Sequence, residues 1–314
     1  MTADGLDLRR ASDNAPVDAD AIGLGGVLSQ RGLRGRAARV PGSLVVHGFR
    51  WNFRDGHTQR WWPQGIAVGE HDGIPIAIAS WFEKPRRDGR AGSRITIVDL
   101  RDTKRPRYHH VRLVLQRRDA TGIHFDPVPV HAGGIVWAGD RLLVAATLGG
   151  IHEFRLSGIL AGNLLPEVTR YRPVGHPEER LRYSFLSLAG QNTAGQAGGE
   201  LHLVAGEYGD GTTHRLANVS LTAAGAAIRD SHVPTIPQMQ GAVLDGDSWF
   251  VTASRGDRIG GDLWSGTSGH LTRREGALPP GPEDLTLGMT PGELWSLSEF
   301  PGKRWVFAFR PDKA

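Results

Sequence analysis

Short apolar runs separated by glycine-containing turns recur along the chain from residue 43 onward, and this feature constrains the fold most. The clearest copy has runs over 134–140, 141–147 and 150–156, with a turn at Gly139-Asp140. Apolar runs of about four to eight residues between Gly, Asp and Pro turns are typical of β-strands. Long helical periodicity is rare in this sequence. The pattern therefore predicts an all-β protein.

The same order of strand, turn and strand recurs in five copies. Their first strands begin near residues 64, 131, 184, 240 and 283. This spacing suits propeller blades of roughly 40–50 residues plus loop insertions. We therefore expect a five-bladed β-propeller over residues 41–314.

The last copy ends at the C-terminus after three strands, and a candidate for the missing strand lies at residues 44–53. Pairing this apolar segment with the blade built from 283–310 would close the ring and remove two exposed sheet edges. Residues 1–40 are polar, rich in glycine and arginine, and without a hydrophobic period. We expect them to form a flexible or loosely docked extension that contributes little to stability.

Composition narrows the classes of function. The absence of cysteine excludes disulfides, thiolate metal sites and cysteine nucleophiles. The net charge of +4 comes from scattered arginine pairs without a dense stripe, so we expect no nucleic-acid partner. No apolar stretch reaches the roughly 18 residues that span a bilayer, so no membrane association is expected. The N-terminus lacks the apolar segment of a signal peptide, and the expected protein is a cytoplasmic monomer.

The propeller fold indicates where function would lie. Loops that enter the first strand of a blade and leave the second strand surround one mouth of the central channel. The first group of candidates at this mouth stands before first strands: Gln64, His131, Gln240 and Glu283. The second group stands after second strands: Trp81, Glu207, Tyr208, Arg255 and Glu299. Trp62 lies in a loop that should overhang the mouth.

Convergent polar groups in one concave mouth indicate a ligand site. We interpret His131, Glu283 and Glu207 as catalytic, because a histidine facing a carboxyl group can divide acid and base roles. Gln64, Gln240, Trp81, Tyr208, Arg255, Glu299 and Trp62 would bind substrate. The expected function is a lyase, cyclase or isomerase acting on a small molecule of specialised metabolism. A bound Mg²⁺ or Ca²⁺, held by His131, Glu283 and Glu207, is an alternative.

Other functions fit the same pattern. A carbohydrate- or peptide-binding propeller would use Trp61, Trp62 and Trp81 as stacking platforms. A protein-interaction scaffold would need a large exposed apolar patch, which no run in the sequence demands. Polar residues also line propeller channels simply to hold structural water. No phosphate-loop spacing and no Gly-x-Ser-x-Gly elbow occurs.

Several motifs carry a family resemblance: WPQG, HAGG, MQGA, GPEDL and SEFPGKRWVFAF. Over about residues 60–310 they resemble a group of uncharacterised actinobacterial proteins, many of them secreted. That resemblance implies a propeller and no established activity. The blade pattern is also similar to that of streptogramin lyases and gluconolactonase-like propellers, which work at the channel mouth with a metal. This second likeness lies at the level of the repeat and assigns no residue a role.

Overall fold

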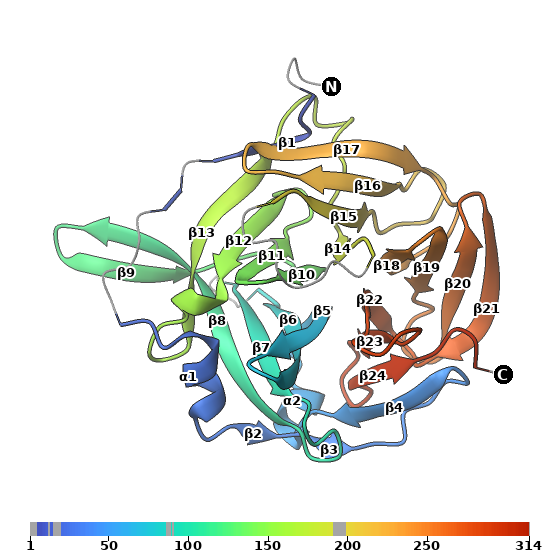
Figure 1. The fold of residues 1–314 in the computed structure, drawn as a ribbon, viewed down its shortest axis with the longest axis horizontal. Coiled ribbons are helices and arrows are strands. Elements are labelled where there is room, and N and C mark those ends of the chain that lie inside the picture. The colour runs from blue at the N-terminus through green and yellow to red at the C-terminus, as the bar shows by residue number, and fades with distance from the viewer. Residues whose placement is uncertain are drawn as a thin grey trace.

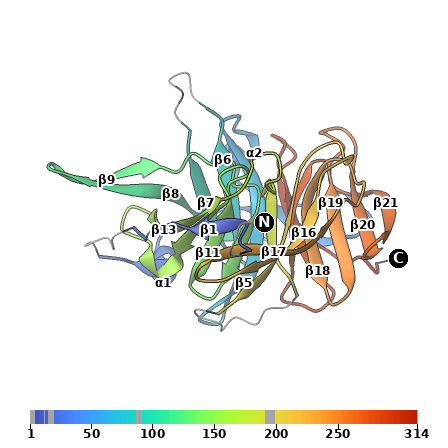
Figure 2. The same ribbon diagram turned by 90° about the horizontal axis from the view of Figure 1, so that it is seen from above.

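The strands of a computed structural model are arranged around a centre, as Figure 1 shows from the front and Figure 2 from above. The structure describes residues 5–11, 13–14, 20–85, 89, 91–190 and 199–313. Most strands fall into consecutive antiparallel sets of four, each running outward from the centre. Within the described residues, no helix has the length and apolar character needed to cross a bilayer.

Five such sets follow one another along the chain. The first contains β5 (Trp61–His71), β6 (Ile74–Glu83), β7 (Ser93–Asp99) and β8 (Arg107–Asp119), and β9 (Gly122–Pro127) extends it. The second contains β10 (Ile135–Ala138), β11 (Arg141–Ala145), β12 (Ile151–Arg155) and β13 (Leu164–Pro173). The third contains β14 (Phe185–Leu188), β15 (Leu201–Gly206), β16 (Leu216–Leu221) and β17 (Gly225–His232). The fourth contains β18 (Met239–Asp245), β19 (Ser248–Ala253), β20 (Gly261–Thr267) and β21 (His270–Leu278). The fifth contains β22 (Pro282–Leu287), β23 (Leu294–Ser298), β24 (Trp305–Phe309) and β4 (Val45–Arg50).

The innermost strands of the sets form a closed circle. Strand β5 contacts β10, β10 contacts β14, β14 contacts β18, β18 contacts β22, and β22 returns to β5. Each set is therefore a blade, and the architecture is a β-propeller. This confirms the all-β propeller fold predicted from the sequence.

Two-residue turns join the first and second strands of three blades. The turn residues are Asp72-Gly73, Gly139-Asp140 and Gly246-Asp247. Gly139 and Gly246 have φ values of 59° and 58°, in the left-handed region that such hairpin turns require. The Gly-Asp pairs that mark turns in the sequence therefore occupy the expected hairpins.

Strand β4 supplies the outer strand of the fifth blade. It pairs antiparallel with β24, placing Val306 opposite Phe49 and Phe307 opposite Gly48. The expected pairing of residues 44–53 with the last blade is thus present for 45–50. The segment then continues into the short helix α2 (Phe53–His57), whose first turn is capped by the Asn52 side chain accepting from Asp55 N at 2.8 Å.

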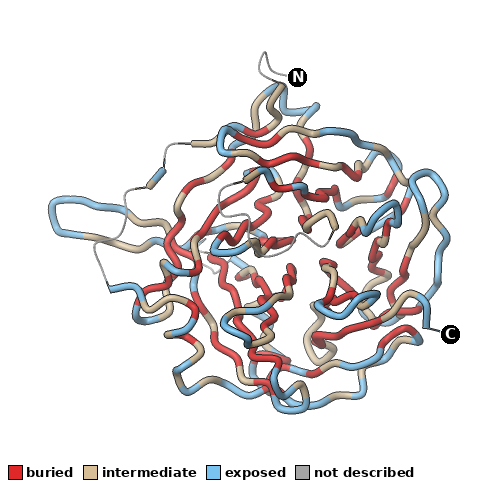
Figure 3. Tube along the Cα trace, viewed as in Figure 1, coloured by how far each residue is buried: buried red, intermediate tan, exposed pale blue. Residues whose placement is uncertain are grey.

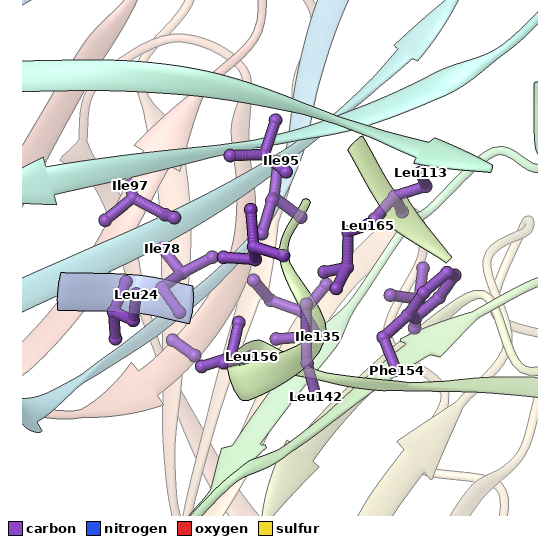
Figure 4. Close-up of a cluster of buried hydrophobic side chains, with 14 of the residues drawn as sticks. Leu24, Ile78, Ile95, Ile97, Leu113, Ile135, Leu142, Phe154, Leu156 and Leu165 are labelled. Atoms are coloured by element: carbon purple, nitrogen blue, oxygen red, sulfur yellow. The ribbon is translucent and has the colours of Figure 1, made fainter. Parts of the chain in front are cut away.

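Apolar side chains fill the spaces between neighbouring blades, and burial runs along the inner strands in Figure 3. The largest of these clusters lies between the first and second blades and is drawn in Figure 4. It contains Ile78 and Ile97 from the first blade, Leu142 and Phe154 from the second, and Leu24 from the N-terminal segment.

The described part of residues 1–40 is docked on the blades, in contrast to the flexible or loosely docked extension that we expected. Strand β1 (Leu8–Arg10) pairs with both β13 and β17, and Leu8 is buried between them. Helix α1 (Gly23–Ser29) buries Leu24 and Val27. Strands β2 (Leu33–Arg34) and β3 (Arg36–Ala37) pair with β8 and β4. The segment thus belongs to the folded body.

Replacing Leu24 by alanine is therefore expected to lower the free energy of unfolding by roughly 2–4 kcal/mol, the usual effect of emptying a buried leucine site. The matched control is Leu33→Ala, because Leu33 is 42% exposed. Urea titration of both variants measures the difference. Equal stability of Leu24→Ala and the wild type would contradict the docking of α1.

Candidate functional site

Residues at the start of each inner strand converge on one cavity of about 350 Å³. Gln64, Ser184, Gln240 and Glu283 come from the beginnings of the first, third, fourth and fifth blades, and Gly133 precedes β10 of the second. Thr147, Tyr208 and Glu299 follow the second strands β11, β15 and β23, and His131 completes the lining. The antiparallel inner hairpin of each blade brings these two chain positions to the same mouth.

Six of the ten predicted site residues therefore share this cavity: Gln64, His131, Tyr208, Gln240, Glu283 and Glu299. Ser184 and Thr147 also line it, although neither was predicted to contribute. Their repeat positions could have indicated them, since Ser184 corresponds to Gln64 and Gln240 at the start of its blade.

Two carboxyl groups meet at the bottom of the cavity. Glu283 is 2% exposed, and it lines the same cavity as Glu299. Burial, reinforced by the neighbouring Glu299 and Asp284, raises the pKa of Glu283 well above its usual value. Burial also raises the pKa of Glu299, while Gln64, Arg304 and Glu283 act in the opposite direction. The two carboxyl groups are therefore coupled, and the protonated form is favoured most strongly at Glu283.

Gln64 holds the Glu299 side chain through a hydrogen bond. Its Nε2 donates to Glu299 Oε2 at 3.2 Å and to the Pro63 carbonyl at 2.8 Å. The remaining oxygen of Glu283, Oε1, is buried and accepts no hydrogen bond from the described residues. A buried acid oxygen without a partner is unfavourable unless a ligand or water satisfies it.

Asp284 lies directly next to this pair on β22 and is completely buried. Its Oδ2 accepts from Ile66 N at 3.1 Å and from Ile135 N at 3.3 Å, which joins the first, second and fifth blades. Burial raises the pKa of Asp284 well above its usual value, although these backbone donors oppose the shift. Asp284 therefore supports the channel wall beneath the cavity.

His131 stands at the rim of the same cavity. Its ring stacks on Phe82 with centroids 4.2 Å apart and an interplanar angle of 23°. Desolvation lowers the pKa of His131, which favours the neutral imidazole near pH 7. The next residue, Ala132, has a φ of 55°, and its carbonyl accepts from Ser80 Oγ at 2.7 Å. A positive φ is unfavourable for a residue that has a side chain, so surrounding contacts such as the Ser80 hydrogen bond must hold Ala132 in this conformation. The same contacts fix the backbone next to His131.

Glu207, predicted to be catalytic, lies outside the cavity lining. It accepts hydrogen bonds from Arg182 N at 2.9 Å and from Arg215 N at 2.8 Å, and it forms an ion pair with the Arg215 guanidinium at 3.0 Å. These donors outweigh burial and lower the pKa of Glu207. The carboxylate therefore fixes the loop, and this placement does not agree with the catalytic role that we expected.

Three residues expected to bind substrate are also placed elsewhere. Trp81 is fully buried in a core cluster, because β6 continues to Glu83 and turns this position inward. The Trp62 ring packs against Phe300 and under Lys84, with Lys84 Nζ 3.6 Å from its centroid. Arg255 pairs with Glu275 at 2.6 Å. None of the three lines the mouth cavity.

The arrangement of His131, Glu283 and Glu207 does not fit the Mg²⁺ or Ca²⁺ site for which the sequence offered them as ligands. Glu207 is held by Arg215 away from the cavity that contains His131 and Glu283. Across the described part of the chain, no three His, Asp or Glu side chains are arranged to hold a metal ion. The three side chains expected to hold Mg²⁺ or Ca²⁺ therefore do not form one coordination site.

The acidic pair should leave a signature in the pH dependence of stability. A carboxyl group whose pKa is raised by folding binds its proton more tightly in the native state, so stability falls as pH rises above about 4. Glu283→Gln keeps a neutral hydrogen-bond donor and removes this proton equilibrium. We therefore expect the difference in melting temperature, Glu283→Gln minus wild type, to increase as the pH rises from about 5 to about 9.

The matched control for this measurement is Glu275→Gln, which changes an exposed carboxylate. Its difference from the wild type should stay nearly constant over the same pH range. A constant difference for Glu283→Gln as well would contradict the raised pKa of Glu283.

The geometry defines a β-propeller with a polar mouth that contains two glutamate side chains and a histidine. No family model and no curated protein matches the sequence. Among solved structures, a gluconolactonase from Xanthomonas campestris is 14% identical, with 96% of this chain and 89% of that chain covered and a TM-score of 0.38. A glycoside hydrolase is 8% identical over 88% and 92% of the two chains, with a TM-score of 0.48. The β-propeller domain of the Trilobed protease from Pyrococcus furiosus is 10% identical over 77% and 78%, with a TM-score of 0.30.

Proposed function

We propose that the protein is an enzyme that transfers protons on a small, neutral or cationic organic molecule at the propeller mouth. The observation that carries this proposal is the Glu283–Glu299 pair in a cavity that also contains His131. A cavity of about 350 Å³ suits a small molecule. Among the residues that the structure describes, no arginine or lysine lines it, which disfavours a carboxylate or phosphate substrate.

Glu283 differs from four other buried carboxylates, of which Asp284 accepts two backbone N–H groups and three are paired with arginine. Asp55 pairs with Arg94 at 3.2 Å, Glu153 with Arg141 at 3.0 Å, and Glu207 with Arg215 at 3.0 Å. Within the described ranges of the chain, Glu283 has no arginine or lysine within ion-pair distance. Burial without a neighbouring cation raises the pKa of Glu283, and this favours the protonated form that an acid catalyst requires.

His131, Glu283 and Glu299 would divide the chemistry. Neutral His131 would accept a proton from a carbon or hydroxyl of the substrate, and Glu283 would donate one to an oxygen that leaves or becomes a hydroxyl. Glu299, held by Gln64, would stabilise the donor. Return of the proton from His131 to the pair through solvent restores the enzyme. This balance fits a lyase, cyclase or isomerase reaction.

Incubation with a panel of neutral and amine-bearing small molecules, followed by mass spectrometry and NMR, tests the proposal. Glu283→Gln and His131→Ala should fold like the wild type and lose turnover by roughly 10²–10⁴-fold, the range for a general acid or base. Glu275→Gln should retain full activity. Turnover that survives both substitutions would overturn the assignment.

A carbohydrate-binding propeller is the second candidate, favoured by the amides of Gln64 and Gln240 beside the 45%-exposed ring of Tyr208. The tryptophan platforms expected for such a protein are not available at this cavity, because Trp81 is buried in the core and Trp62 packs against Phe300. A binder would return its ligand unchanged. Its affinity would depend on Tyr208 and Gln240 more than on His131.

A further inference from the structure

The N-terminal segment crosses the seam between the fifth and first blades. Leu33 and Arg34 of β2 pair with β8, and Arg36 and Ala37 of β3 pair with β4. Gly35, between them, donates its N–H to the Pro106 carbonyl at 2.8 Å. Figure 1 shows β2 and β3 along the same outer edge of the molecule.

Like charges face each other along this seam. Arg34 is the direct cross-strand partner of Arg107, and Arg36 is the partner of Arg50. Directly opposed side chains have Cβ atoms about 5 Å apart, and like charges at that position are destabilising.

A cavity of about 500 Å³ opens at the first of these pairs. It is lined by Ser29, Gln30, Arg31, Gly32, Arg34 and Arg107, so three arginines border one space. In the part of the chain that the structure describes, no acidic residue lines the cavity, and none of the three arginines has a carboxylate within ion-pair distance. The cross-strand neighbour of Arg107, Asp99, is instead bonded by Arg101, with Nη2 2.6 Å from its carboxylate.

Some exposed arginines elsewhere on the surface are paired with a carboxylate, as in Arg229 with Glu200 at 2.9 Å and Arg101 with Asp99 at 2.6 Å. Others, such as Arg54 and Arg118, have no carboxylate within ion-pair distance among the described residues. The cavity differs from both kinds of site because three arginines line one space that no described acidic residue lines. The three arginines at one cavity thus leave a local excess of positive charge.

At one wall of the cavity the backbone of Gly32 packs closely against the side chains of Arg107 and His109. A side chain at Gly32 would place its Cβ 2.5 Å from Arg107 Cγ and 2.7 Å from His109 Nε2. His109 is 5% exposed, and its Nε2 has no hydrogen-bond partner among the described residues. Burial and the neighbouring Arg107 lower the pKa of His109. Glycine at position 32 therefore keeps the backbone against a buried polar group at the edge of the arginine cluster.

We propose that this cavity binds a small oxyanion with at least two negative charges, of the phosphate type, independently of the mouth site. Guanidinium groups bind phosphate oxygens through paired N–H donors, and Arg34 and Arg107 stand in register to do so together. Because Arg31 and Arg34 belong to the N-terminal segment and Arg107 to the first blade, the anion would connect the two. Binding should therefore stabilise the docked segment.

Isothermal titration and thermal unfolding with inorganic pyrophosphate at low ionic strength test this site. The wild type should bind saturably and gain melting temperature. Arg34→Gln and Arg107→Gln should each weaken binding by at least about tenfold, the effect of losing one charge-assisted contact. Arg117→Gln is the matched control, because Arg117 is exposed and paired with Asp119 outside the cavity.

The like-charge contact adds a readout that a solvated basic surface would not give. Without pyrophosphate, Arg34→Gln should be at least as stable as the wild type, because the repulsion with Arg107 is removed. Its melting temperature should rise less with pyrophosphate than that of the wild type. Equal stabilisation of wild type and Arg34→Gln, or binding of duplex DNA without saturable pyrophosphate binding, would overturn the proposal. Equal affinity for citrate would overturn the preference for phosphate.

Discussion

A chain that lacks residues 1–55 is expected to unfold or aggregate, the largest effect that we predict. The deletion removes β4 and leaves β24 as the edge of the fifth blade. That edge has the sequence WVFAF over 305–309, and all five side chains are buried in the intact protein. An exposed apolar edge of this kind pairs with other chains. The deletion also removes the buried side chains of Phe49 and Trp51.

The ends of the paired strands provide a sharp control. Phe309, at the end of β24, lies opposite Val45, at the start of β4, and Arg310 N donates to the Leu44 carbonyl at 3.1 Å. Residues 41–55 moved to follow residue 314 through a short glycine-serine linker can therefore form the same pair as a hairpin. This rearranged chain should unfold cooperatively and remain monomeric in size-exclusion chromatography, with a melting temperature below that of the full chain because it lacks the buried side chains of Leu8, Leu24 and Val27. A deletion of 1–55 that is monomeric and as stable as the full chain would contradict the role of β4 in closing the ring.

The propeller and the pairing of its last blade could be predicted because they depend on local signals. Alternating apolar runs and Gly-Asp turns determine hairpins within a few residues, and the apolar 44–53 segment had one free edge to pair with. The N-terminal segment gave no such signal. Its strands are two or three residues long, and each pairs with a partner distant in the sequence. Their stability comes from the blades that they contact.

The candidate site also has one part that the repeat pattern predicts and another part that depends on contacts distant in the sequence. Repeat positions predicted which chain ends surround the mouth, and six of the named side chains line one cavity. The sequence could not show which polar groups were already satisfied. Glu207 is fixed by Arg215, and Trp81 faces the core because β6 extends to Glu83, beyond the expected end at Ser80. Both depend on loop geometry and strand length, which the repeat pattern does not determine.

The second large effect is expected at Gly134, immediately before β10. A Cβ at this position would overlap Leu186 N and lie 2.8 Å from Phe185 C, so backbone atoms of the third blade occupy the space. Gly134→Ala is expected to lower the free energy of unfolding by about 4 kcal/mol or more, at the upper end for a single substitution. Relief would require moving one whole inner strand away from the other.

Gly158→Ala is the control, because the nearest atom to its Cβ would be Arg155 Cβ at 4.0 Å. It should change stability by no more than about 0.5 kcal/mol. Urea unfolding of both variants measures the difference, and a small effect at Gly134 would contradict the close approach of the inner strands. Gly65 and Gly241 meet neighbouring blades in the same way: their Cβ atoms would lie 2.9 Å from Gly134 C and 2.5 Å from Leu285 N. The glycines that follow Gln64 and Gln240 in the sequence thus let the inner strands approach closely enough to bring two amides and an acidic pair into one small cavity.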